Sequence, residues 1–294
     1  MKGTNAWNRT KTIKALSLLF LNHIDAWGIT FIISSLALLL HEALNVRTML
    51  LVVGLTVGYW FAFAMNDYWD APYDATDQRK AQRNFFVVQQ VRPWQVGLVA
   101  GSVGILLLVL FASFGWRGIG IIALSLFVAW AYSAPPLRFK GRPGIDLLVH
   151  ALFVETFPYL ICLLLTRLPW TRLDAVLLTV LALASLSAQL EQQLRDFDVD
   201  AQTGATFATT VGRRHTTILL HASTALLMIV AIVNVLNGTI PLFVAAFGLI
   251  ALPALLHRFV RGNSKPRSEK LIILSALTGL LYVGFILIFY ATRS

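Results

Sequence analysis

Long apolar stretches dominate the chain, and each is close to the ~20 residues that a helix needs to cross a bilayer. Nine of them are separated by short polar or proline-containing segments: 13–40, 48–69, 94–114, 118–134, 145–166, 173–192, 215–236, 239–257 and 271–292. Only 13% of the residues are charged, about half the ~25% typical of soluble domains. A chain with so little charge cannot cover a water-soluble surface. These features exclude a soluble globular enzyme, a disordered protein and a nucleic-acid-binding domain.

The same pattern predicts an all-α polytopic membrane protein with nine transmembrane helices, arranged as two facing four-helix bundles plus one helix. The length of 294 residues suits a single membrane-embedded domain, 1–294, with an N-terminal half 1–142 and a C-terminal half 143–294. Cys162 is the single cysteine of the chain. It cannot form an internal disulfide, and a cysteine-based metal site is excluded.

Lysines and arginines fall mainly on one side of the predicted spans. Nineteen of the 24 lie in the N-terminal tail or in the loops after the second, fourth, sixth and eighth spans, and five lie on the other side. By the positive-inside rule, the N-terminus and these loops face the cytoplasm. The distribution also accounts for the net charge of +10, which therefore gives no sign of a nucleic-acid partner.

Acidic residues gather in two clusters, each at the predicted cytoplasmic end of a span. The first cluster covers 66–77 and the second covers 191–200, and together they hold eight of the 14 acidic residues. Asn66, Asp70 and Asp74 are four residues apart, as are Asp196 and Asp200. Residues at i and i+4 share one face of a helix, and Mg²⁺ commonly bridges one or two carboxylates to substrate phosphates. A merely solvated acidic helix end is the alternative interpretation of each cluster.

Basic residues surround both clusters on the same predicted side. They are Arg79, Lys80 and Arg83 after the first cluster, Arg195, Arg213 and Arg214 around the second, and Arg138, Lys140 and Arg142 in a third loop. A divalent cation between carboxylates, next to lysines and arginines, is the chemistry of a bound diphosphate.

Three motifs resemble those of the UbiA-type intramembrane prenyltransferases. Asn-Asp-x-x-Asp-x-x-x-Asp at 66–74 is similar to their first signature, and Asp196 to Asp200, followed by Gly204 and Gly212, is similar to the second. The segment 132–140, Tyr-Ser-Ala-Pro-Pro-Leu-Arg-Phe-Lys, resembles a third. The second motif is most similar to menaquinone-type members, and 142–146 is weakly similar to carotenoid-elongating members. The loop 77–84 lacks the prolines that many members have, and the threonine expected after Gly204 is displaced, so the branch and the acceptor stay open.

The resemblance implies Mg²⁺-dependent transfer of a prenyl group from a polyprenyl diphosphate to a lipid-soluble acceptor, either an aromatic or quinone precursor or an isoprenoid. Two groups of site residues follow from it. The implied metal ligands are Asn66, Asp67, Asp70, Asp74, Asp196 and Asp200. The implied catalytic residues are four of these aspartates: Asp70, Asp74, Asp196 and Asp200. The implied diphosphate contacts are Asn66, Arg79, Lys80, Arg83, Tyr132, Arg138, Lys140 and Arg195. The partners expected are the donor, a hydrophobic acceptor and the lipid bilayer, without an obligate protein partner.

Polar residues within the spans are candidates for the acceptor pocket. Asn22 and Asp25 lie in the first span, which borders the acceptor pocket in this family, and Glu155 lies in the fifth. Ionisable groups within membrane helices are functional candidates by default. An interhelical polar contact is the alternative for each of them.

Two other functions compete with the transferase. A membrane terpene cyclase of the same superfamily would use the same aspartate motifs and quench the carbocation internally. A cation transporter would use the carboxylates as ion ligands, but transporter sites usually lie near the bilayer midplane, and arginines beside a cation site would oppose transport.

Overall fold

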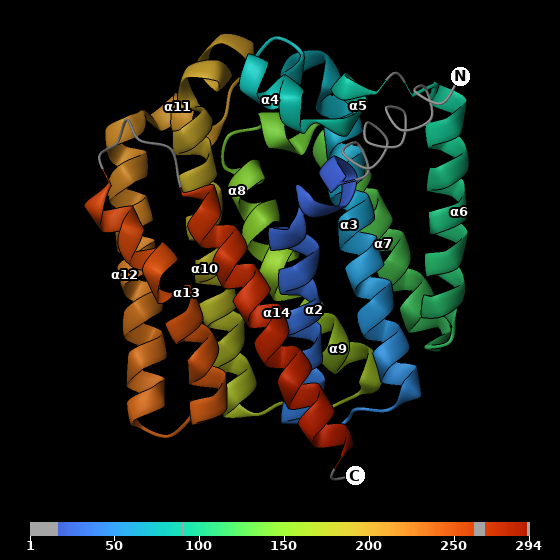
Figure 1. Cartoon of the computed structure of the whole chain (residues 1–294), viewed down its shortest axis with the longest axis vertical. Helices are drawn as coiled ribbons and strands as arrows, with labels where there is room; N and C mark the ends of the chain where they lie inside the picture. The colour runs from blue at the N-terminus through green and yellow to red at the C-terminus, as the bar shows by residue number, and fades with distance from the viewer. Residues whose placement is uncertain (1–16, 90, 262–267, 293–294) are drawn as a thin grey trace, which may run out of the picture. The chain divides into compact units, whose positions relative to one another are not determined.

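A computed structural model describes residues 17–89, 91–261 and 268–292. These residues form helices joined by short turns, and no strand occurs among them. The helices are α2 (Ile24–Leu40), α3 (Val46–Asp74), α4 (Gln78–Arg83), α5 (Phe85–Val88), α6 (Pro93–Ala112), α7 (Gly115–Ser133), η1 (Phe139–Gly141), α8 (Ile145–His150), η2 (Ala151–Thr156), α9 (Phe157–Thr166), α10 (Arg172–Thr203), α11 (Phe207–Val211), α12 (Arg213–Leu236), α13 (Leu242–Val260) and α14 (Glu269–Ala291) (Figure 1). The all-α fold predicted from the sequence is confirmed.

Eight helical stretches in the described residues are long and apolar enough to cross a membrane, with α8, η2 and α9 forming one of them (145–166). The helix α2 is shorter, at 17 residues, and the first predicted span, 13–40, begins outside the described residues. Many large apolar side chains on the spans point outward; Ile105 is 66% exposed and Leu281 is 76% exposed. Such surfaces suit lipid and not water, so the chain is an integral membrane protein.

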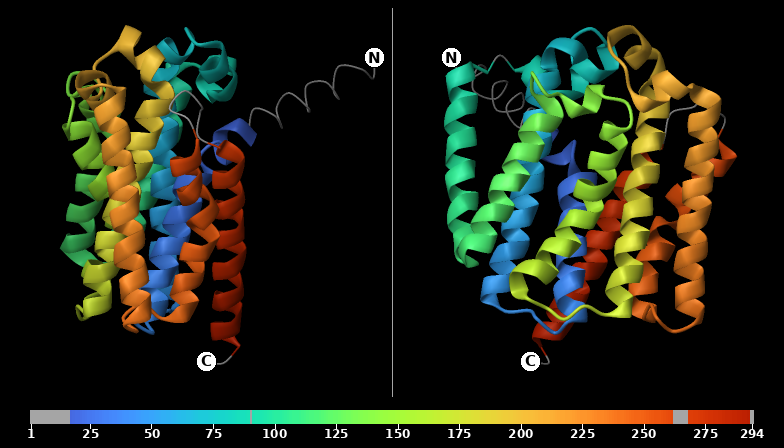
Figure 2. Two further views of the ribbon diagram at one scale, coloured as in Figure 1. Left: turned by 90° about the vertical axis from the view of Figure 1, so that its left-hand side faces the viewer. Right: turned by 180° about the vertical axis from the view of Figure 1, so that it is seen from behind.

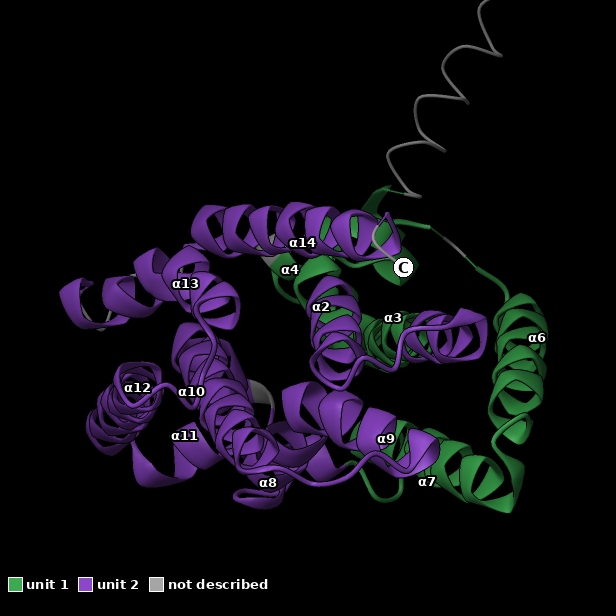
Figure 3. Ribbon diagram, turned by 90° about the horizontal axis from the view of Figure 1, so that it is seen from below, with its two compact units in different colours: residues 1–27, 56–138 green, residues 28–55, 139–294 purple. Residues whose placement is uncertain are grey.

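The chain divides into two compact units, shown in different colours in Figure 3. Unit 1 comprises 1–27 and 56–138, and unit 2 comprises 28–55 and 139–294. In unit 1, α6 packs beside α7 (Figure 2). A Cβ atom at Gly118 would overlap the carbonyl oxygen of Phe111, so glycine is required for this close antiparallel pair.

In unit 2, α10 packs against α12 and against the α8–η2 segment (Figures 1 and 2). Its side chains Leu190 and Leu194, four residues apart, join Leu147 and Leu220 in a buried cluster. Because successive residues advance about 100° around a helix, this stripe leaves the opposite face of α10 to Asp196. The core of unit 2 thereby fixes the rotation of the helix that carries the second motif.

The other end of α10 is held by a buried carboxylate. Asp174 has no exposed surface and accepts hydrogen bonds from Tyr159 Oη at 2.7 Å and from the Thr171 hydroxyl at 2.7 Å, and it lies 2.9 Å from His41 Nε2. Thr171 caps α10 in return, because its hydroxyl accepts from the Asp174 backbone N–H. This cluster ties the turn after α2 and the helix α9 to the start of α10.

Candidate active site

The first aspartate motif lies at the carboxyl end of α3, within unit 1. The helix continues through Pro72 and ends at Asp74, although a proline at this place removes the hydrogen bond to the Tyr68 carbonyl. A helix often kinks or ends at such a proline. Since α3 is continuous, Asn66, Asp70 and Asp74 lie on one face, as the spacing predicted.

Asn66 is oriented by the last residue of α7. The Ser133 hydroxyl, 4% exposed, donates to Asn66 Oδ1 at 2.7 Å. Ser133 belongs to the Tyr-Ser-Ala-Pro-Pro segment, so the structure brings this segment to the first aspartate motif. Tyr132, the predicted diphosphate contact, is the neighbouring residue on α7.

Arg138, which follows that segment, lies beside the first motif. Its Nη2 atom is 3.6 Å from Asp70 Oδ1, and its guanidinium lies 3.9 Å from the ring centre of Tyr73. A cation held over an aromatic face is attracted by the ring quadrupole. The two contacts fix a positive charge next to the carboxylate of Asp70.

Asn84 joins the short helices of unit 1 to the motif, a role that the sequence analysis missed. Its side-chain N–H groups donate to the Asp67 carbonyl and to Asp74 Oδ2, each at 2.8 Å. Its Oδ1 accepts from the Phe86 N–H at 2.9 Å and caps α5. The side chain is buried at 2% exposure. An asparagine directly before Phe-Phe-Val-Val is an N-cap signal, but its bond to Asp74 needs the fold.

The break before α2 also contacts the first motif. His23 Nε2 lies 2.7 Å from Asp67 Oδ2, and the adjacent Asn22 accepts two hydrogen bonds of 3.3 Å from Arg83. Asn22, a predicted acceptor-pocket residue, thus pairs with a predicted diphosphate contact. Asp25 stands half-buried in the first turn of α2.

The remaining basic residues of the first loop lie on α4. The backbone N–H of Lys80 donates to Asp77 Oδ1 at 3.0 Å, which ties the start of this helix to the end of the acidic cluster. Arg79 lies on α4 as well, but its side chain is outside the described part of the structure. Lys140 lies on η1, in unit 2.

The second aspartate motif lies near the carboxyl end of α10, which runs unbroken to Thr203 before Gly204 ends it. Asp196 and Asp200 therefore share one face. The Asp196 side chain is 16% exposed, whereas that of Asp198 is 86% exposed and forms an ion pair with Arg213. Asp198 is two residues from Asp196, about 200° around the helix, so the two side chains lie on opposite sides of α10.

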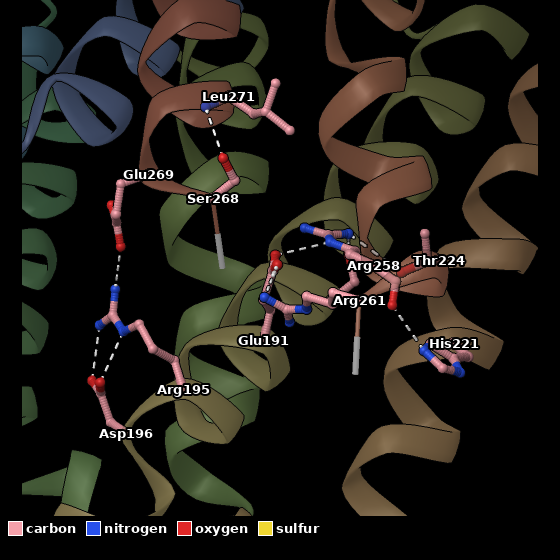
Figure 4. Close-up of polar contacts among 11 residues, drawn as sticks. Glu191, Arg195, Asp196, His221, Thr224, Arg258, Arg261, Ser268, Glu269 and Leu271 are labelled. Atoms are coloured by element: carbon pink, nitrogen blue, oxygen red, sulfur yellow. Dashed lines mark hydrogen bonds and ion pairs between the residues drawn. The ribbon is translucent and has the colours of Figure 1, made fainter. Parts of the chain in front are cut away.

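Arg195 holds Asp196 through both carboxylate oxygens. Its Nε and Nη2 atoms donate to Oδ1 and Oδ2 at 2.8 Å each, and its Nη1 donates to Glu269 on α14 at 2.8 Å (Figure 4). Such bidentate pairs are among the strongest charge-assisted hydrogen bonds. In this arrangement the guanidinium is turned to two carboxylates.

Gln193 and Asp146 form a second set of contacts that holds α10, the helix of the second motif. The sequence analysis did not predict these contacts. Asp146 has no exposed surface, and its Oδ2 accepts from Gln193 Nε2 and from the Phe207 backbone N–H. Gln193 Oε1 accepts from the Ala208 N–H at 2.9 Å. The Asp146 carboxylate and the Gln193 amide thus tie α8 and α11 to α10.

Glu191, the first residue of the second acidic cluster, contacts the end of α13 and not the aspartates of the second motif. It is 4% exposed and lies 2.9 Å from both Arg258 Nε and Arg261 Nη1, at the end of α13 (Figure 4). A buried carboxylate between two guanidiniums is a paired charge, so Glu191 holds α13 to α10. Glu155 lies in the π-helical segment η2, a conformation frequent at functional sites.

A model of the UbiA prenyltransferase family matches residues 27–290 of the chain. The chain belongs to the UbiA prenyltransferase family. The membership predicted from the three motifs is therefore confirmed, and with it the class of enzyme, a prenyltransferase. A search of curated proteins gave no match.

Solved structures of UbiA homologues share the fold. A homologue from Archaeoglobus fulgidus bound to GPP and Mg²⁺ is 15% identical with a TM-score of 0.71, over 93% of this chain and 99% of that one. An apo homologue from Aeropyrum pernix K1 is 13% identical with a TM-score of 0.68, over 91% and 98%. A digeranylgeranylglyceryl phosphate synthase structure is 12% identical with a TM-score of 0.61, over 93% and 99%.

The donor set of this UbiA chain fits Mg²⁺. All the candidate ligands carry oxygen donors, and no group of three or more histidine, cysteine, aspartate or glutamate residues forms a metal cage in the described ranges. Mg²⁺ keeps several waters and is usually bound by one or two carboxylates plus substrate phosphates, not by a dedicated protein cage. The pairs Asp70 with Asp74, and Asp196 with Asp200, are sets of that kind.

Proposed function

We propose that this protein transfers a prenyl group from a polyprenyl diphosphate to a lipid-soluble acceptor in a Mg²⁺-dependent reaction within the membrane. The observation that carries the proposal is that each unit holds two carboxylates on one helix face with an arginine beside one of them. In unit 1 the carboxylates are Asp70 and Asp74, and Arg138 lies beside Asp70. In unit 2 they are Asp196 and Asp200, and Arg195 binds Asp196. Family membership supports the reaction class. The homologue structures bound to GPP and Mg²⁺, and to DMAPP and Mg²⁺, support the donor and the metal.

In this proposal, the carboxylates of both motifs hold Mg²⁺. The ligands are drawn from Asn66, Asp67, Asp70 and Asp74 on α3 and from Asp196 and Asp200 on α10. Bound Mg²⁺ stabilises the negative charge that develops on a leaving diphosphate. Ser133 holds the Asn66 amide, and Asn84 holds the Asp74 carboxylate, so that these groups are oriented before the substrate arrives.

Basic and hydroxyl groups contact the diphosphate in the same proposal. They are Arg79, Lys80, Arg83, Tyr132, Arg138, Lys140 and Arg195. A fixed cation near the leaving group costs no reorganisation during the reaction. The apolar spans exclude water from the allylic cation. Asn22, Asp25 and Glu155 are proposed to border the acceptor, which is an aromatic or quinone precursor or an isoprenoid.

The test is product analysis by mass spectrometry on membranes that contain the protein. Prenyl diphosphates of increasing length are supplied with and without lipid-soluble acceptors, in Mg²⁺ or in EDTA, with Asp70→Asn as the inactive control. We expect prenylated acceptor only in Mg²⁺ and only with the unchanged protein. Hydrocarbon from the diphosphate alone would instead indicate a cyclase. Full turnover in EDTA would overturn the metal-bridged site.

A further inference from the structure

The guanidinium of Arg195 lies between two carboxylates that come from different helices (Figure 4). Two of its nitrogens donate to Asp196, which is next to it on α10, and the third donates to Glu269, the first residue of α14. The neighbouring carboxylate on α10, Glu191, binds Arg258 and Arg261. The Arg195 fork therefore connects the second aspartate motif to the last membrane helix.

The bidentate contact with Arg195 holds the Asp196 carboxylate in one orientation. An ionised carboxylate offers about four lone-pair sites on its two oxygens, and Arg195 uses one site on each oxygen. The two contacts from the planar fork fix the plane of the carboxylate. Hydrogen bonds of this kind to a ligating carboxylate orient it and set its basicity.

The charge of the group depends on Glu269. Arg195 and Asp196 together are neutral, and a neutral pair attracts a divalent cation less than a free carboxylate does. Glu269, whose side chain is 29% exposed, returns the trio to one net negative charge. It also holds the guanidinium from the side opposite to Asp196, so that the fork stays aligned.

We propose that Glu269 is a positioning residue for the second metal site, acting through Arg195 on the orientation and charge of Asp196. This inference rests on the proposed function, because it assigns Asp196 a Mg²⁺ ion. It gives Arg195, a proposed diphosphate contact, the further role of aligning a metal ligand. It also makes the start of α14, more than 60 residues along the chain from the motif, part of the active-site support.

A purely structural role for Glu269 makes a different prediction. Glu269 stands in the first turn of α14, whose N-terminus is capped by Ser268. An acidic residue there interacts favourably with the helix dipole. If that were its role, its loss would lower stability and leave the Mg²⁺ dependence unchanged. The two roles are therefore separated by measuring metal binding and unfolding on the same variant.

The experiment compares Glu269→Gln and Arg195→Lys with the unchanged full chain in detergent. Asp198→Asn is the matched control, because it removes one negative charge from the same motif at an exposed position. Binding of Mg²⁺ in the presence of inorganic diphosphate is followed by calorimetry, and the thermal midpoint is measured without ligand. The Mg²⁺ concentration for half-maximal rate is measured with a prenyl diphosphate donor.

We expect Glu269→Gln and Arg195→Lys to need about 10–100-fold more Mg²⁺, the usual cost of losing a group that orients a metal ligand. Asp198→Asn should stay close to the unchanged protein, and Glu269→Asp should recover part of the loss. A folded Glu269→Gln with unchanged Mg²⁺ dependence would overturn the inference, and so would failure of both variants to fold. If the unchanged protein itself bound no Mg²⁺ with diphosphate, the proposed function would fail instead.

Discussion

Asp196, Asp198 and Asp200 have the same chemistry but different environments on one helix. About 40° separates Asp196 from Asp200, and about 200° separates Asp198 from each. We expect Asp196→Asn and Asp200→Asn each to lower kcat/KM by well over tenfold, because each loses a charged metal ligand. Asp198→Asn should stay within about tenfold, or about 1.4 kcal/mol of barrier. Steady-state kinetics of the three purified variants is the measurement.

The exposed ion pair of Asp198 with Arg213 explains why its loss should be mild, since such surface pairs contribute about 0–1 kcal/mol. If Asp198→Asn were as damaging as Asp196→Asn, in protein that still folds and inserts, the one-face assignment of the second metal site would be wrong. The family membership would stand.

Single residues were predictable from the sequence where their role depends on position along a helix. The i, i+4 spacing placed Asp70 with Asp74 and set Asp198 apart from Asp196. The sequence did not predict the roles of Asn84, Ser133 and Gln193. These residues act through contacts with partners 10 to 67 positions away along the chain. Single amide or hydroxyl side chains do not recur at a helical period in the sequence. Their contacts are therefore determined by how the helices pack in the fold.

At the scale of elements, α5 owes its place to one side chain. Asn84 both caps this helix and donates to Asp74. We expect Asn84→Ala to destabilise the protein by about 0.5–2 kcal/mol through loss of the cap, and to lower activity because the Asp74 carboxylate loses a fixed donor. Thermal unfolding and steady-state kinetics measure the two effects.

Asn84→Ser separates capping from catalysis, because serine keeps a capping oxygen but is too short to donate as the amide does. It should recover stability relative to Asn84→Ala without recovering activity. Recovery of both by serine would show that Asn84 acts on the site only through the helix it caps.

Element boundaries were less predictable than element positions. A proline such as Pro72 often ends a helix, yet α3 continues to Asp74. Contacts from Asn84 to Asp74 and from Arg138 to Asp70 hold the end of α3. Hydropathy does not predict the π-helical segment at 151–156. A π-helix has about one more residue per turn than an α-helix, and this change of geometry does not alter the apolar run in the sequence.

At the scale of the whole molecule, hydropathy predicted the all-α class of fold and the approximate positions of eight of the nine expected spans, because an apolar run of about 20 residues can satisfy its backbone groups in lipid as a helix. It could not predict which spans pack together. The close pairing of α6 with α7 depends on Gly118, and that of α10 with α8 depends on buried polar contacts such as Gln193 with Asp146.

Sidedness is the property of the whole chain that the distribution of lysine and arginine predicts. Cys162 is buried, so a cysteine introduced at an exposed site can be labelled selectively. We expect Gln82→Cys on α4 to react with a membrane-impermeant maleimide only from the cytoplasmic face. Ser113→Cys, between α6 and α7, should react only from the opposite face, because α6 separates the two positions by one span. Labelling of Gln82→Cys from outside the cell would invert the topology, and the diphosphate site would then face away from the cytoplasm.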